Sequence, residues 1–394
     1  MTRTVFTGGE VFDGTGSAPE RADVLVEDGR IIAVGSGLDG DSSVDCAGRT
    51  VLPGLFDAHV HVAMSTHISM SKKQTDPFSY HFFESAVNLR KTLALGITTV
   101  RDAGGADLGV KRAVEDGLIP GPRMRISIGA LSQTGGHGDF GNFPYPGCPA
   151  TVVDGPEEVR KAARELLKAG ADQLQVCTTG GVLSPGDDPR HSHFTPEELD
   201  VLAREASMQG SYVMAHAQGT QGNKNAIRAG VRSIEHGTLL DDEVIEMMLE
   251  AGTWLVPTLS APVNIVRAFD AGADMPEPVI RKARDLLDIH MEATHKAAAA
   301  GIKIAMGTDA GVGPHGSNLE EFTLMVECGM TPTQSLVVGT TSAAELLRFD
   351  HELGRIAEGY RADLVLLDGG INDLSDLADR VREVWKDGQR GSAA

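Results

Sequence analysis

The chain has 394 residues, with 35 basic and 55 acidic side chains and a formal net charge of −20 at pH 7. This negative charge, without any basic run, excludes a partner that presents a phosphate backbone, so we expect no nucleic-acid partner. Hydrophobic residues make up 41% and charged residues 23%, which is typical of a globular protein. No apolar run approaches the roughly 20 residues of a membrane-spanning helix, so no membrane partner is expected.

The compartment is suggested by the cysteines and by the start of the chain. The four cysteines are scattered, without a CxxC pair: Cys46, Cys148, Cys177 and Cys328. Scattered cysteines are typical of free thiols in a reducing compartment. The first residues, MTRTVFTGGEVFDGTG, lack the apolar core of a signal peptide. Both observations favour a cytoplasmic protein.

The first fifty residues predict short β-strands. Apolar and polar residues alternate in VFTGGEVFDG, ADVLVEDGRIIAVG and SSVDCAGRTVLPG, and the Asp-Gly step at 28–29 is typical of a β-hairpin turn. The same pattern returns near the C-terminus in GRIAEGYRADLVLLDG and REVWKDGQ. We therefore expect segments 1–54 and 346–394 to pair into one small β domain.

Between these segments, short apolar runs alternate with amphipathic stretches at helical spacing. Eight runs predict core strands, at residues 55–62, 97–104, 123–130, 172–178, 211–217, 231–237, 253–259 and 302–310. Helices are expected at 157–170, at 196–210 with Thr195 as N-cap, and at 278–301. Such alternation over residues 55–345 predicts an α/β fold of the (β/α)8 TIM-barrel class.

In a (β/α)8 barrel the active site lies at the carboxyl ends of the strands, and chemically active side chains fall at several of these ends. The first predicted strand ends in DAHVH, where alternation points His59 and His61 to one side. The fifth, sixth and eighth strands end at His216, His236 and Asp309. Imidazole and carboxylate ligands gathered at one place favour a divalent metal site, such as one for zinc. An aspartate beside the ion can orient and deprotonate a metal-activated water.

The motifs around these residues resemble those of the amidohydrolase superfamily over nearly the whole chain. They are LPGLFDAHVHV (52–62), TTVRDAGG (98–105), TGGHGD (134–139), TTGGVLSP (178–185), AHAQGTQG (215–222), IEHGT (234–238) and GTDAG (307–311). The pattern resembles the imidazolonepropionase-like and Xaa-dipeptidase-like branch. The resemblance implies a metal-dependent barrel, a composite β-sandwich built from both termini, a small-molecule substrate and a homo-oligomer.

The resemblance also assigns the metal ligands. Five residues match the ligands of binuclear relatives: His59, His61 and Asp309 for the first ion, His216 and His236 for the second. A carbamylated lysine usually bridges the ions, but the matching position holds Gln175. Without the carbamate, only an aspartate and a hydroxide offset the +4 charge of two ions about 3.5–4 Å apart. We therefore expect a second ion to bind weakly.

Three explanations of Gln175 stay open. The chain can be a natural mononuclear enzyme, in which His216 joins the three residues of the first site and His236 polarises the substrate. It can be an inactivated Lys-to-Gln variant of a binuclear hydrolase, because the flanking LQVCTTGGV keeps the lysine-type context. It can also be a natural protein that has lost catalysis.

Three further residues are candidates for substrate binding. His137 lies in the TGGHGD loop, and the resemblance implies contact with a substrate carbonyl or carboxylate. Gln218 stands where dipeptidase-like relatives often carry a tyrosine that binds the α-carboxylate, which argues against a dipeptide with a free carboxylate. His315 lies in the loop after the eighth predicted strand, within reach of the pocket. Arg101 is expected to be a structural residue of the barrel.

The sequence therefore predicts a hydrolase that uses one or two divalent ions, with zinc preferred, to cleave a C–N bond of an amide, peptide-like or carbamate substrate. Asp309 would accept the proton of the attacking water and pass it on, while His236 and the metal would stabilise the oxyanion. The alternative within the superfamily is a mononuclear deaminase or cyclic-amide hydrolase, which the neutral amide of Gln175 favours. The alternative of another class is a non-catalytic small-molecule binder.

Overall fold

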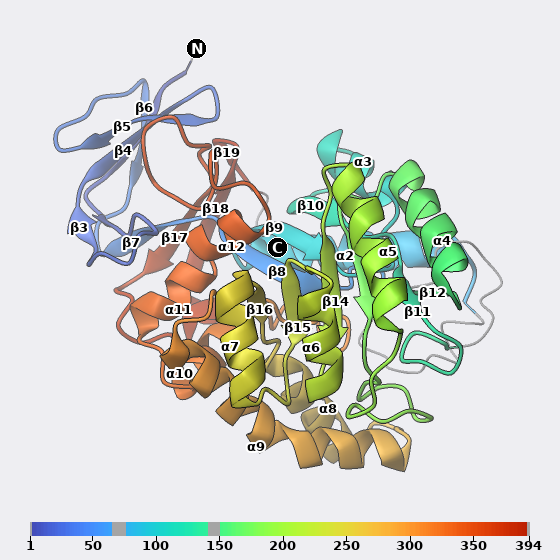
Figure 1. Ribbon diagram of the computed structural model, residues 1–394. Helices are drawn as coiled ribbons and strands as arrows, with labels where there is room; N and C mark the ends of the chain where they lie inside the picture. The colour runs from blue at the N-terminus through green and yellow to red at the C-terminus, as the bar shows by residue number, and fades with distance from the viewer. Residues whose placement is uncertain (1, 65–75, 141–149, 392–394) are drawn as a thin grey trace.

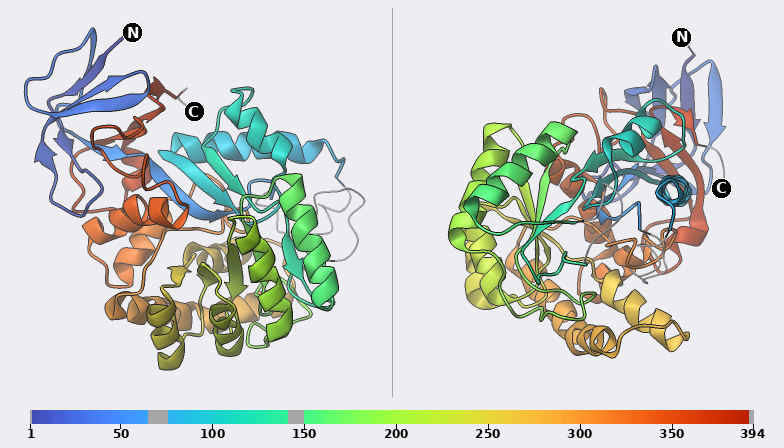
Figure 2. Two further views of the ribbon diagram at one scale, coloured as in Figure 1. Left: turned by 45° about the horizontal axis from the view of Figure 1, so that its top comes forward. Right: turned by 90° about the vertical axis from the view of Figure 1, so that its right-hand side faces the viewer.

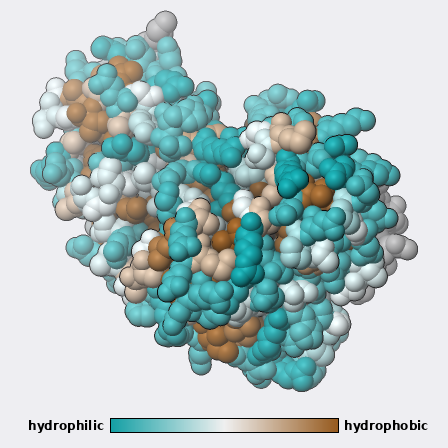
Figure 3. All heavy atoms as spheres, viewed as in Figure 1, coloured by the Kyte–Doolittle hydropathy of each residue, from teal (hydrophilic) through white to brown (hydrophobic). Residues whose placement is uncertain are grey.

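The computed structural model describes residues 2–64, 76–140 and 150–391. A β region built from the chain termini lies at one side of the molecule, and parallel strands covered by helices form the rest (Figure 1). In both views of Figure 2 the N-terminal strands and the C-terminal segment lie side by side. Polar residues cover most of the face shown in Figure 3, as expected for a strongly charged chain.

The terminal β region contains two sheets. The first, in the order β5-β4-β1-β6, consists of Arg30–Gly35, Asp23–Glu27, Thr4–Thr7 and Ser42–Asp45. The second, in the order β19-β18-β17-β7-β2-β3, consists of Gln389–Arg390, Val381–Lys386, Leu364–Asp368, Arg49–Pro53, Glu10–Val11 and Glu20–Arg21. Because β17 pairs antiparallel with β7, the two ends of the chain share one sheet, as expected from their β patterns.

Local sequence explains how this region is built. The turn between β4 and β5 places Asp28 at φ 49° and Gly29 at φ 76°, the left-handed backbone that a two-residue Asp-Gly hairpin requires. Phe6 of the first sheet packs in one buried core with Val51 and Leu364 of the second. Burial of these side chains holds the two sheets against each other.

The larger part of the molecule is α/β, with parallel sheets. One sheet, in the order β10-β9-β8, consists of Arg123–Ile126, Ile97–Asp102 and Leu55–Val60. The other, in the order β12-β11-β13-β14-β15-β16, consists of Ala150–Val152, Ala130–Ser132, Leu174–Cys177, Val213–Ala217, Ser233–His236 and Trp254–Val256. Each predicted core strand except the last therefore contains an observed strand.

The last predicted strand, 302–310, is irregular. Ile304 forms an isolated parallel bridge with Leu255, and Ala310 forms one with Val60, so the segment lies between β16 and β8. Asp309 has a φ of 58°, in the left-handed region, which interrupts an extended strand. The α/β class and its parallel sheet are confirmed, whereas closure into one eight-stranded barrel stays a prediction.

Helices cover the outside of the parallel sheets, with α4 to α7 along the six-stranded one (Figure 1). Their bounds are α2 Tyr80–Ala94, α3 Leu108–Glu115, α4 Pro156–Ala169, α5 Pro196–Met208, α6 Thr220–Arg228, α7 Asp242–Ala251, α8 Ser260–Asp270, α9 Glu277–Ala300, α10 Glu320–Glu327, α11 Pro332–Val338, α12 Thr341–Leu346 and α13 Leu377–Arg380. The three predicted helices match α4, α5 and α9, and Thr195 caps α5 in a capping box with Glu198. Among the described residues, no helix combines the length and apolar character needed to cross a bilayer.

Three of the four cysteines fall in the described part of the chain. Cys46, Cys177 and Cys328 are buried free thiols, as the scattered positions predict. Cys148 lies outside the described residues.

Candidate metal centre and its pocket

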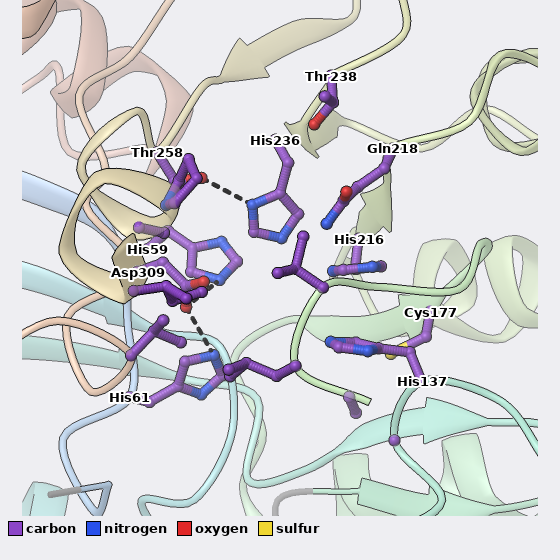
Figure 4. A pocket seen from close by; sticks show the side chains of 18 of the residues that line it. His59, His61, His137, Cys177, His216, Gln218, His236, Thr238, Thr258 and Asp309 are labelled. Carbon is purple, nitrogen blue, oxygen red and sulfur yellow. Dashed lines mark hydrogen bonds and ion pairs between the residues drawn. The ribbon is translucent and has the colours of Figure 1, made fainter. Parts of the chain in front are cut away.

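A pocket at the carboxyl ends of the parallel strands brings together eight of the nine predicted site residues (Figure 4). They are His59, His61, His137, Gln175, His216, Gln218, His236 and Asp309. Four of them lie in the strands β8, β13, β14 and β15, namely His59, Gln175, His216 and His236, and His61 and Gln218 directly follow β8 and β14. Parallel strands of each sheet direct their carboxyl ends to the same side. The geometry therefore gathers side chains that are far apart in the sequence.

His59 within β8 and His61 just after it direct the same ring nitrogen to Asp309. His59 donates its Nδ1–H to the Glu235 carboxylate at 2.7 Å, and His61 donates its Nδ1–H to the Gly104 carbonyl at 2.8 Å. Since both partners can only accept, Nε2 of each neutral ring carries the free lone pair. Asp309 Oδ1 lies 3.5 Å from His59 Nε2 and 3.2 Å from His61 Nε2. Three potential ligand atoms thus face one point.

This arrangement fits a divalent cation. Two ligands of a tetrahedral zinc ion, each about 2.0–2.1 Å from it, lie about 3.4 Å apart, close to the separations observed here. Asp309 Oδ1 is buried and, among the described residues, has no partner in hydrogen-bonding geometry. The ligand atoms of His59, His61 and Asp309 all lie within 4.8 Å of one another. A buried acceptor between two lone-pair nitrogens is stabilised by a cation, so the donor set suits a bound metal.

Burial and nearby charge set the protonation of the cluster. Burial lowers the pKa of His59, but the neighbouring carboxylates of Asp309 and Glu235 outweigh it and raise that pKa to about 9. Burial opposes the charge of Asp309, yet the neighbouring imidazoles hold its pKa well below the usual range. Burial lowers the pKa of His216 to about 4 and, with repulsion from His216, keeps the pKa of His236 well below its usual value. The last two imidazoles are therefore neutral near pH 7.

The second pair of histidines lies beside the first. His216 donates its Nε2–H to the Gly180 carbonyl at 3.2 Å, which leaves Nδ1 as its lone-pair nitrogen. His236 Nδ1 lies 2.7 Å from Thr258 Oγ1. The centroids of the His216 and His236 rings are 4.6 Å apart. His236 has a φ of 73°, and Thr258 a φ of 54°. Such backbone costs about 1–3 kcal/mol per residue and is concentrated at functional sites.

A buried ion pair contacts His59 of the candidate metal site, and sequence reasoning missed one of its members. Glu235 accepts hydrogen bonds from Arg101 Nη2 at 2.9 and 3.0 Å, in addition to the one from His59. Arg101 also donates to the Ala58 carbonyl at 2.6 Å and to Ser233 Oγ at 3.1 Å. Arg101 thus has the structural position expected of it. The available signal for Glu235 was a charged side chain within a predicted core strand, because a buried charge requires a partner.

Two of the three predicted substrate residues, His137 and Gln218, reach the pocket, as does Gln175 at the position of the usual bridging lysine. The Oε1 atoms of Gln175 and Gln218 are buried and, within the described chain, have no hydrogen-bond partner. The His137 ring stacks on His216 at a centroid distance of 4.3 Å (Figure 4). These polar groups have hydrogen-bonding capacity that a bound molecule can satisfy.

His315 has a different environment from the one expected. It is buried but does not line the pocket. It donates its Nε2–H to the His61 carbonyl at 3.1 Å, and its Nδ1 lies 3.2 Å from Thr92 Oγ1. Through these contacts His315 stabilises the backbone at His61 and does not face a substrate.

Much of the remaining lining is apolar. It comes from the loop after β13, from helices α8 and α9 and from the segment after Asp309, with Val182, Leu183, Pro262, Ile265, Leu286 and Val312 among its members. Neither lysine nor arginine occurs among the described residues that line the pocket. The pocket therefore combines a polar floor with an apolar wall, as small-molecule sites commonly do.

Comparison with known proteins identifies the family. Residues 50–390 match the Amidohydrolase family. The chain belongs to the amidohydrolase family. Its relatives include ochratoxinase from Aspergillus niger, 34% identical over 98% of this chain and 86% of that protein. Imidazolonepropionase from Geobacillus sp. (strain WCH70) is 24% identical over 94% of this chain and 91% of that protein.

Solved structures agree with this assignment. A Xaa-Pro dipeptidase with bound methionine in the active site is 34% identical, with a TM-score of 0.90 over 98% of this chain and 99% of that one. A prolidase complexed with N-methylphosphonate-L-proline is 36% identical, with a TM-score of 0.93 over 99% of both chains. The family resemblance of the motifs is therefore confirmed. This amidohydrolase is a hydrolase of C–N bonds in a metal-dependent superfamily.

Proposed function

We propose that this amidohydrolase cleaves an amide or peptide-like bond with one divalent cation, zinc in the first instance, held by His59, His61 and Asp309. The observation that carries the proposal is the buried Asp309 Oδ1, which faces two imidazole nitrogens at 3.2 and 3.5 Å and, within the described residues, has no partner in hydrogen-bonding geometry. Relatives named ochratoxinase and Xaa-Pro dipeptidase support an amide-like substrate. The apolar wall supports a substrate with an apolar group next to the scissile bond.

The residues of the chain divide the chemical work. A divalent cation in this site would lower the pKa of a water molecule and polarise the scissile carbonyl. Asp309 would accept a proton from the attacking water and deliver it to the leaving nitrogen. His236, held through Nδ1 by Thr258, would face the carbonyl oxygen as negative charge develops on it. Glu235 would keep His59 in the tautomer that leaves Nε2 free.

Gln175 supports a single ion. Its amide is neutral and cannot replace the negative charge of a carbamylated lysine, so a second ion near His216 and His236 would meet too little negative charge. We therefore expect Gln175→Lys to raise the metal content from about one ion per chain to about two. If the variant gains hydrolysis together with the second ion, the present chain is an inactive form of a binuclear hydrolase. If the variant instead loses a hydrolytic activity that the present chain has, a natural mononuclear enzyme is supported.

A deaminase is the second candidate, and one observation favours it. Gln175 Oε1 is buried in the pocket and, in the described chain, has no hydrogen-bond donor. A ring N–H of a heterocycle would supply that donor. An ammonia-release assay over amino-substituted purines and pyrimidines distinguishes this candidate from a hydrolase, because amide hydrolysis of an N-acyl amino acid releases none.

The test of the main proposal combines metal analysis with a substrate panel. We expect purified protein to contain one zinc-type ion per chain, and chelation to abolish hydrolysis until the ion is restored. The panel pairs N-acyl amino acids with the corresponding neutral anilides and carbamates. His61→Ala is expected to lose both the ion and activity. Protein that neither contains nor responds to Zn, Fe, Mn or Co would contradict the proposal and leave a non-catalytic binder.

We also propose the architecture that surrounds the site. Residues 55–345 would form a closed (β/α)8 barrel, which the bridges of Ile304 and Ala310 to the two parallel sheets support. Segments 1–54 and 346–394 would form a composite β-sandwich, supported by the core shared between the terminal sheets. A cytoplasmic homo-oligomer completes the proposal, and the buried free thiols fit a reducing compartment.

A further inference from the structure

A series of buried polar contacts leads from helix α9 to the loop beside the pocket. Lys282 of α9 donates from Nζ to the carbonyls of Gly181 at 2.6 Å, Ser184 at 2.5 Å and Asp187 at 3.2 Å. The same Nζ lies 3.4 Å from Asp187 Oδ1. Lys282 is only 8% exposed, and a buried ammonium is tolerated when its donors are all used. Lys282 therefore fixes the loop 181–187 against α9.

The directions of the hydrogen bonds in this loop follow from the donors and acceptors present. The Asp187 carboxylate only accepts, and Ser184 Oγ lies 2.5 Å from its Oδ1, so the hydroxyl proton of Ser184 is used there. Ser184 Oγ also lies 2.7 Å from His137 Nδ1. Because a hydroxyl has one proton, Ser184 must accept from His137. His137 consequently carries a proton on Nδ1.

Packing restricts the His137 ring as well. A Cβ on Gly181 would lie 2.2 Å from both Nδ1 and Cε1 of His137, so the absence of a side chain there makes room for the ring. The His137 ring also stacks on the His216 ring, at a centroid distance of 4.3 Å and an interplanar angle of 16°, which restricts its movement further. In Figure 4 the His137 ring extends into the pocket beside His216.

We propose that Ser184 and Asp187, anchored by Lys282, are positioning residues that hold His137 in the Nδ1–H tautomer and leave Nε2 to face the substrate as a hydrogen-bond acceptor. The catalytic consequence of this arrangement rests on the proposed hydrolase function, whereas the hydrogen-bond arrangement itself does not. The arrangement differs from the contact with a substrate carbonyl or carboxylate that family resemblance implies, because either contact needs a donor at Nε2.

The tautomer can be measured directly by magic-angle-spinning 15N NMR of the full chain labelled at its 13 histidines. The signal absent from the His137→Gln variant identifies His137, and it should have a protonated Nδ1 and an unprotonated Nε2. Ser184→Ala should lose this pattern, and Ser184→Thr should keep it because the hydroxyl remains. Ser335→Ala is the matched control, since Ser335 is buried and donates to the Phe322 carbonyl outside the pocket.

The activity readout is the kcat/KM of the best substrate in the panel. Loss of a hydrogen-bond partner that orients a site histidine reduces activity by about 10- to 100-fold, which is the fall expected for Ser184→Ala but not for Ser335→Ala. A wild-type His137 protonated on Nε2 alone, or an unchanged His137 signal in Ser184→Ala, would overturn the proposal. If the wild type has the expected signal but hydrolyses no amide, the proposed function fails while the positioning role of Ser184 stands.

Discussion

Glu235 contacts both Arg101 and His59, the first histidine of the proposed metal site. Arg101 and Glu235 have side chains that are both 0% exposed, so neither charge is solvated by water. We expect Glu235→Gln to destabilise the fold and to weaken metal binding together. The substitution keeps the shape of the side chain but removes its charge and one of its two acceptor oxygens.

The magnitude follows from the contacts of Glu235. Its two oxygens accept from His59 at 2.7 Å and from Arg101 at 2.9 and 3.0 Å, and a glutamine oxygen can serve only one side of this set. Removal of one partner of a buried ion pair costs about 3–5 kcal/mol, and we expect about 3 kcal/mol because the amide oxygen and Ser233 still accept from Arg101. Loss of the acceptor that orients His59 should weaken metal binding about 10- to 100-fold.

Two measurements test this expectation. Urea unfolding of metal-free protein gives the change in the free energy of unfolding, and calorimetric titration with zinc gives the change in affinity. Glu205→Gln is the matched control, because Glu205 accepts from Arg160 and Arg164 far from the pocket and Arg164 is 60% exposed. That change should leave the zinc affinity unchanged. Equal effects of the two substitutions on zinc affinity would refute the reasoning that Glu235 supports the proposed metal site.

Two further predictions concern the stability of the fold. Burial raises the pKa of Glu321 to about 8 from its usual 4.5, so the folded state alone retains the proton between these values. Stability should therefore fall as pH rises from about 4.5 to 8, and Glu321→Gln should flatten this dependence in urea unfolding measured across pH. The Thr195 side chain accepts from the Glu198 backbone N–H at the start of α5. Thr195→Ala should lower the unfolding free energy by about 1 kcal/mol in the same assay, and an unchanged value would contradict the capping role.

Regular elements were predictable because their signals are local. The apolar runs predicted β8, β9 and β13 to β16. The glycine at position 170 and the Thr195 cap predicted the bounds of α4 and α5 to within two residues of those observed. The segment 302–310 was not predictable at this level. Asp309 takes a left-handed backbone there, and contacts with the neighbouring β8, such as the hydrogen bond from its N–H to the His59 carbonyl at 2.8 Å, accompany that conformation.

The candidate site was partly predictable for a related reason. Side-chain alternation predicted that His59 and His61 share one side, and the parallel topology predicted that His216, His236 and Asp309 meet them. Gln175 was identified as a departure from the family pattern by its position alone.

What the sequence alone determined was which residue types stand at the strand ends, and therefore the family and the class of chemistry. The tertiary structure decided which ring nitrogen each histidine presents, because that depends on partners distant in the chain, such as Glu235 for His59 and Ser184 for His137. It also decided that His315 supports the backbone of His61 instead of lining the pocket. Hydrogen bonds act over about 3 Å, and only the folded chain brings donors and acceptors from separate strands and loops within that range.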